Sequence, residues 1–251
     1  MFSQLKADWI VGWKNIITKK YVGDSHGYTC EQTAVGTTNG AGPQNVQLFM
    51  LAPDGTVLNC LPGFWHPEDL ARELKLAQKL LTVWQDPSLS PAAKKLAFAE
   101  LQRGELKRQP KETYARSAWQ GFDAKNELKR IQKGVKRDTV KLDAEGKPLL
   151  NARGKPQMKT TNVVVKERMA ARPFVPFAEF DTATFANYGR SYYDNNKKVD
   201  GAGTTFMTPK RVAKKEKRAK RKANKEARRK MRLERRARRA KRRGKPLDDL
   251  N

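Results

Sequence analysis

The stretch from Asn45 to Trp84 decides the fold, and it reads NVQLFMLAPDGTVLNCLPGFWHPEDLARELKLAQKLLTVW. Val46 to Ala52 is an apolar run of strand length. Pro53-Asp54-Gly55 has turn chemistry, because Pro presets φ, Asp caps locally and Gly accepts a positive φ. Thr56 to Leu61 then returns as a second strand. The sequence therefore predicts a β-hairpin that ends at Pro62-Gly63.

An amphipathic helix follows the hairpin. Pro67 suits the first helical position, and Glu68 and Asp69 favour the positive end of the helix dipole. Apolar residues then recur at spacings of four, three, four and three, which places them on one helical face. They are Leu70, Leu74, Ala77, Leu81 and Trp84. A hairpin followed by a helix that covers it is a unit that can pack.

This order of elements resembles the C-terminal ββα portion of the thioredoxin-like fold, and Trp9 to Ile17 resembles a central parallel strand of that family. The resemblance covers about the first 85 residues and implies an α/β fold. The family's Cys-x-x-Cys motif is missing, and Asn45 stands where the family has a cis-proline, with Pro43 two residues earlier. We therefore expect an N-terminally shortened, non-redox relative, or a recorded start downstream of the true one.

Three regions are predicted: a thioredoxin-like domain over residues 1–104, a charged, turn-rich and aromatic arm over 105–207, and a basic helical tail over 208–251. Ser90 and Pro91 signal the start of a second helix and Gly104 its end. Two similar octapeptides, beginning at Asp143 and Asn151, predict a small meander within residues 139–166, with Val163 to Val165 as its best strand.

Large aromatic side chains are dense in residues 172–193. A linker without structure rarely carries so many, so this segment is expected to cover a hydrophobic surface. That surface belongs either to the first domain or to a protein partner.

Charge is the strongest compositional signal, with 53 Lys and Arg against 26 Asp and Glu, a net charge of +27. Residues 210–245 hold 22 bases and three acids, a net +19, whereas residues 1–209 hold 31 bases and 21 acids, a net +10. No segment reads as a transmembrane helix or signal peptide, and two cysteines do not make a disulfide framework. A cytoplasmic protein without a membrane partner is expected.

The tail predicts phosphate binding. Residues 210–243 contain neither Pro nor Gly and favour a helix, yet too few apolar residues are present to dock that helix on a core. We expect a nucleic-acid partner, RNA rather than DNA, bound with little sequence specificity and no cofactor. The predicted contacts are Lys214, Lys215, Lys217, Arg218, Lys220, Arg221, Lys222, Lys225, Arg228, Arg229, Lys230, Arg232, Arg235, Arg236, Arg238, Arg239, Lys241, Arg242 and Arg243.

Candidates for chemistry are few. His26, Cys30, Cys60 and His66 are all the His and Cys of the chain and form two close pairs, although their spacing is not that of a zinc finger. Cys60 in the second hairpin strand reads most simply as a small buried residue. The alternative function is a thioredoxin-related thiol protein, with Cys30 as its weak catalytic candidate and the redox segment missing or degenerate. A non-catalytic binding protein is favoured.

Overall fold

The computed structural model describes residues 2–16, 18–25, 37–135, 137–190 and 192–193, together with 217, 221, 224–227 and 231. The chain divides into a first unit, Met1–Thr205, and a second unit, Phe206–Asn251. Helices and strands are both present, as the α/β prediction requires. The elements are α1 (Phe2–Asp8), β1 (Asp24–Ser25), β2 (Gln47–Leu51), β3 (Val57–Pro62), α2 (Pro67–Gln85), α3 (Pro91–Arg108), α4 (Lys111–Arg116), α5 (Gly121–Gln132), α6 (Thr161–Ala170), α7 (Thr182–Phe185) and β4 (Tyr192–Tyr193).

The predicted hairpin is confirmed. β2 and β3 pair antiparallel, with Leu48 opposite Leu61. In the turn, the Asp54 carboxylate accepts the Thr56 N–H at 2.9 Å, and Gly55 has a φ of 84°. Every residue of β3 is buried, so this strand is the centre of the core.

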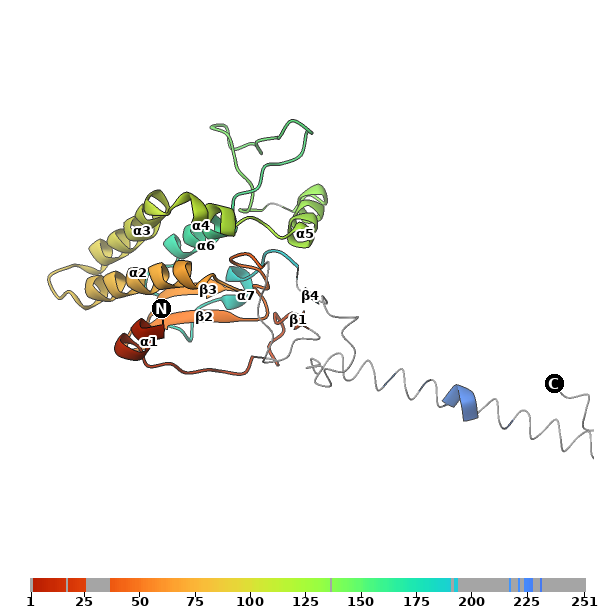
Figure 1. Ribbon diagram of the computed structural model, residues 1–251, viewed down its shortest axis with the longest axis horizontal. Helices are drawn as coiled ribbons and strands as arrows, with labels where there is room; N and C mark the ends of the chain where they lie inside the picture. The colour runs from red at the N-terminus through yellow and green to blue at the C-terminus, as the bar shows by residue number, and fades with distance from the viewer. Residues whose placement is uncertain are drawn as a thin grey trace, which may run out of the picture. The chain divides into compact units, whose positions relative to one another are not determined.

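Three layers build on β3 (Figure 1). α2 and α6 each contact β3, and α3 packs against both of these helices. The predicted α2 helix is confirmed, with Pro67 as its first residue. Its buried apolar side chains are Leu74, Leu76, Ala77 and Leu80, while Leu70, Leu81 and Trp84 are partly buried against the same core.

The segment that follows α6 covers the hairpin of its own chain. The Val57 N–H donates to the Val175 carbonyl at 2.9 Å, and the Phe177 N–H donates to the Gly55 carbonyl at 3.0 Å. Four of the segment's rings are buried in the core: Phe174, Phe180, Phe185 and Tyr188. The hydrophobic surface that the aromatic segment was expected to cover is therefore the hairpin, and Phe177 keeps 38% of its surface exposed.

Two predicted strands are wrong. Residues 9–16 form neither strand nor helix, and Ile10, Val11 and Trp13 are exposed by 103%, 73% and 90%. A strand needs a neighbour to pair with, and the edge of the hairpin beside β3 is taken by residues 175–177. Val163 to Val165 lie in α6. There, burial of Val164 and Val165 against the core outweighs the β preference of branched residues.

The predicted domain boundary at residue 104 is also wrong. α3 begins at Pro91 as expected, with the Ser90 hydroxyl accepting the Ala93 N–H at 3.2 Å, but it continues through Gly104 to Arg108. Packing of α3 on α2 and α6 outweighs the helix penalty of one glycine, about 1 kcal/mol. Residues 105–190 belong to the first unit rather than to a separate arm.

The repeated octapeptides form a protrusion, defined here as residues 140–158. Both predicted turns are present, with Gly146 and Gly154 at φ 76° and 67°. The strands of the predicted meander are reduced to isolated pairs, which are Val140 with Met158, Leu142 with Pro148 and Leu150 with Pro156. In Figure 1 the protrusion projects away from the helices between the ends of α5 and α6.

Candidate nucleic-acid interface

Three of the predicted phosphate contacts fall on described residues of the second unit. Lys217, Arg221 and Lys225 are helical and exposed, and their spacing of four places them on one helical face. The remaining sixteen predicted contacts lie outside the described residues. Glu226 is exposed on the same helical stretch, and Lys230, its predicted ion-pair partner, lies outside the described residues.

Cys60 is buried in β3, as predicted for a small apolar residue, and its thiol is free. Burial raises the pKa of this thiol well above its usual value, so the reactive thiolate is disfavoured. The weakly predicted metal site also needs His26 and Cys30, and Cys30 is the weak redox candidate. Both residues lie outside the described residues. Within the described part of the chain, His, Cys, Asp and Glu side chains gather nowhere in the groups of three or more that a metal ion requires.

Asp69 in the first turn of α2 is buried and fully bonded. Both of its carboxylate oxygens accept from the Arg116 guanidinium at 2.8 Å, and Asn39 and Thr113 each donate to it at 2.7 Å. Burial alone would raise the pKa of Asp69, but these hydrogen bonds outweigh it and hold that pKa below its usual value. Asn39 also accepts the His66 N–H at 2.7 Å, so one polar cluster fixes the start of α2.

Glu73, one helical turn after Asp69, meets Lys166 of α6 inside the core. The Lys166 ammonium donates to the Glu73 carboxylate, and the Asn59 amide of β3 donates to the same oxygen at 2.7 Å. The side chains of Lys166 and Glu73 are 0% and 1% exposed. Because this ion pair is closed to solvent, it can hold α2, α6 and β3 together but gives no access to a substrate.

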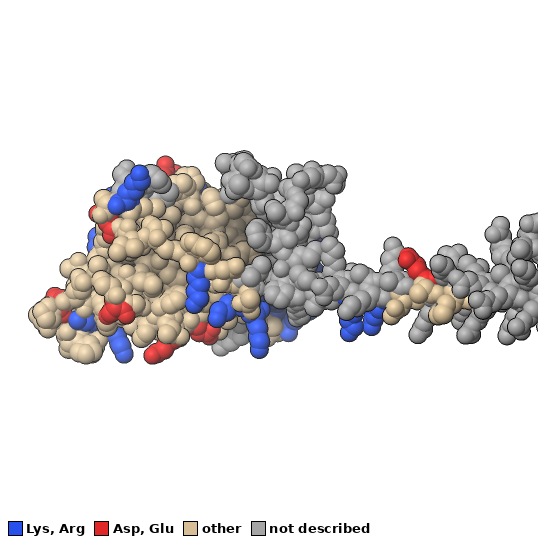
Figure 2. All heavy atoms as spheres, turned by 90° about the horizontal axis from the view of Figure 1, so that it is seen from below, with Lys and Arg blue, Asp and Glu red and all other residues tan. Residues whose placement is uncertain are grey.

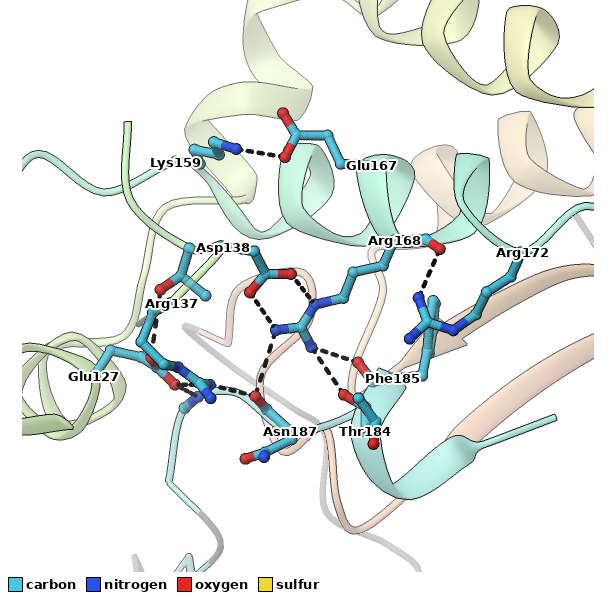
Figure 3. A network of polar contacts seen from close by, with 12 residues as sticks. Glu127, Arg137, Asp138, Lys159, Glu167, Arg168, Arg172, Thr184, Phe185 and Asn187 are labelled. Atoms are coloured by element: carbon cyan, nitrogen blue, oxygen red, sulfur yellow. Dashed lines mark hydrogen bonds and ion pairs between the residues drawn. The ribbon is translucent and has the colours of Figure 1, made fainter. Parts of the chain in front are cut away.

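Arg168 of α6 and Arg137 are the centres of a second polar network (Figure 3). Arg168 donates to both carboxylate oxygens of Asp138 at 2.7 Å and to the Phe185 carbonyl at 2.5 Å. Arg137 donates to both carboxylate oxygens of Glu127 at 2.9 Å. Burial would raise the pKa of Asp138, but the hydrogen bonds and charge of Arg168 outweigh it and lower that pKa.

These clusters share a consequence for the surface. Five acids on the helices are buried, namely Asp69, Glu73, Glu105, Asp123 and Glu127, while most helical bases point outward. Sequence reasoning missed this division. Acids four residues apart beside an apolar stripe were a readable signal. Their partners Arg116, Lys166 and Arg137 lie outside the helices of these acids and cannot be found by spacing.

None of the helices in the described ranges combines the length and apolarity that a bilayer crossing needs. No protein-family model, no curated protein and no solved structure matches the chain. The thioredoxin-like resemblance therefore stays a prediction, and function has to be inferred from charge and geometry.

Proposed function

We propose that the protein binds nucleic acid, RNA in preference to DNA, through the phosphates, using the Lys- and Arg-rich segment 210–245. The single observation that supports this most strongly is the charge of that segment, 22 bases against three acids in 36 residues. Such a density of one sign repels itself unless counter-charge is present. Phosphate contacts provide that counter-charge and release condensed ions from the nucleic acid.

RNA is preferred because arginine-rich segments are a common RNA-binding element that folds on its ligand. Little base readout is expected. Arginine is the main side chain of the segment that reads base edges, and contacts to phosphate carry no sequence information. The first unit, with its smaller net charge, is proposed to make protein contacts within a ribonucleoprotein.

The test is a salt titration of the full chain with a labelled 20-nucleotide RNA of mixed sequence, read by fluorescence anisotropy. With about 6–10 phosphate contacts, affinity should fall about 10³- to 10⁵-fold between 50 and 200 mM salt. A variant with six arginines changed to glutamine should lose most of this binding. These are Arg228, Arg229, Arg235, Arg236, Arg238 and Arg239.

The matched control changes the same six arginines to lysine. It keeps the charge and removes the bidentate guanidinium geometry. If phosphate charge drives binding, the lysine variant should keep nearly all of the affinity and the salt slope. Binding that survives the glutamine variant, or that ignores salt in the wild type, would refute the proposed function.

The thiol alternative now depends on Cys30 alone, because the Cys60 thiol is buried. Titration of the native protein with a thiol reagent at neutral pH tests it. One fast-reacting thiol that disappears in Cys30→Ser would favour the thiol protein, whereas slow reaction at both cysteines would exclude it.

A further inference from the structure

The exposed face of α5 is a row of lysines. Lys125, Lys129 and Lys133 are exposed at intervals of four residues, so they lie along one side of the helix about 6 Å apart in axial rise. Lys133 is the C-terminal capping residue. Among the described residues, these three ammonium groups make no ion pair.

The acids of α5 are turned to the opposite side. Asp123 is 3% exposed and accepts the Arg190 N–H at 2.5 Å. Glu127 is 0% exposed and accepts from Arg137 and from the Gly189 N–H at 2.9 Å. Both carboxylates are therefore buried and hydrogen-bonded inside the fold, and α5 presents only positive charge to solvent.

The protrusion continues this positive surface. It exposes Lys141, Lys147, Arg153 and Lys155, and its acids are Asp143 and Glu145. Its base adjoins α5, because the Thr139 hydroxyl donates to Glu127 at 3.4 Å. Residues 121–158 hold ten bases and five acids, so they contribute +5 of the +10 carried by residues 1–209.

The stability of the α5 helix explains only part of this lysine row. Lysines in the last turn of a helix stabilise its dipole, which explains Lys129 and Lys133. Lys125 lies in the second turn of α5, beyond the first and last turns in which the helix dipole acts, so the dipole does not explain it. Like charges four apart also repel, by about 0.2–0.5 kcal/mol per pair, so the row of lysines does not stabilise the helix.

An exposed basic row on α2 is different. On α2, Arg72, Lys75 and Lys79 are exposed, but Glu68 begins the same row and its side chain is 70% exposed. In the view of Figure 2, acidic and basic side chains are interspersed over the first unit. On α5 and the protrusion, seven exposed bases face one exposed acid, Glu145, so positive charge dominates this surface.

We propose that the α5 lysine row and the protrusion form a second phosphate-binding surface, which recognises a double-helical stem of the RNA. This inference rests on the proposed function. A preformed ridge on a folded unit matches phosphates that hold fixed positions, as duplex RNA does, whereas an arginine-rich segment that folds on its ligand adapts to any strand. The surface therefore adds a preference for RNA shape to the low specificity of the tail.

The test uses the full chain and two labelled RNAs of equal length, a hairpin with a long stem and an unstructured strand. The variant is Lys125→Gln with Lys129→Gln and Lys133→Gln. The control, Arg72→Gln with Lys75→Gln and Lys79→Gln, removes the same charge from α2. Each lost phosphate contact lowers the slope of log affinity against log salt by about 0.7–0.9.

The wild type should bind the hairpin more tightly than the strand. The α5 variant should lose that preference, and its slope on the hairpin should fall by about 2–3, while the α2 control keeps both. Equal effects of the two variants, or a wild type without hairpin preference, would overturn the inference while leaving tail binding intact. A wild type that binds neither RNA would overturn the proposed function itself. Urea unfolding midpoints equal to the wild type confirm that both variants are folded.

Discussion

Changing Lys166 to Met tests the view that α2, α6 and β3 are held by one buried ion pair. The substitution keeps a long apolar stem but leaves the Glu73 carboxylate, which is 1% exposed, with the Asn59 amide as its hydrogen-bond donor among the described residues. Breaking a buried pair by removing one partner costs about 3–5 kcal/mol, because the other charge stays buried without compensation.

The assay is urea unfolding followed by circular dichroism. For a slope of about 2 kcal/mol/M, a loss of about 4 kcal/mol moves the midpoint down by about 2 M. Lys159→Met is the matched control, because Lys159 pairs with Glu167 at 2.5 Å and their side chains are 20% and 43% exposed. A pair at the surface is worth about 0–1 kcal/mol, so its midpoint should move by at most about 0.5 M.

A second variant separates lost charge pairing from lost packing. Adding Glu73→Gln to Lys166→Met removes the stranded charge, and the glutamine carbonyl can still accept from Asn59. The double variant should therefore be more stable than Lys166→Met alone by at least about 1 kcal/mol. If Lys166→Met costs no more than Lys159→Met, or if the double variant recovers nothing, the buried pair does not hold the layers as argued.

Three further predictions concern other parts of the first unit. Asp69→Asn should lose stability at neutral pH. Because folding lowers the pKa of Asp69, its carboxylate stabilises the fold above about pH 4, and this stabilisation is lost as the pH falls through the folded-state pKa. The unfolding midpoints of variant and wild type should therefore converge on acidification. A gap that widens in acid would contradict this. Gly63→Ala should lower the melting temperature more than Gly55→Ala: both glycines have a φ near 80°, but an added Cβ at Gly63 would lie 2.3 Å from a backbone oxygen and at Gly55 would meet nothing within 4 Å. Trp13, 90% exposed, should supply most of the fluorescence that acrylamide quenches, and Trp13→Phe should remove it.

The local part of the fold was readable from the sequence. The hairpin, the start of α2 at Pro67 and the start of α3 at Pro91 each depend on neighbouring residues, such as Pro53-Asp54-Gly55 and the cap at Ser90. Rules for turns and caps act over a few residues, so one sequence is enough to apply them.

The predictions that were wrong concern segments whose structure depends on residues far away in the chain. Val163 to Val165 have the composition of a strand, but α3 and β3 offer a surface that a helix covers. Trp9 to Ile16 have the composition of a buried strand, but composition cannot supply a strand beside them. The exposed row on α5 was likewise hidden, because the inward face of the helix is revealed by Arg137 and Gly189, partners of Glu127 that lie 10 and 62 residues away.

The backbone hydrogen bonds of the protrusion determine which insertions and deletions it can accept. Three backbone hydrogen bonds run in a ring, from Leu149 to Lys141, from Gln157 to Leu149 and from Lys141 to Gln157, at 2.9, 2.7 and 2.9 Å. These three residues are eight apart, the length of one copy of the repeat. If one copy were deleted, Lys141 and Gln157 could exchange both of their N–H···O bonds with each other, as opposed residues do in an ordinary antiparallel pair. Gain or loss of a whole octapeptide would therefore leave the stem at Thr139 and Lys159 undisturbed, whereas a change of any other length would break the ring.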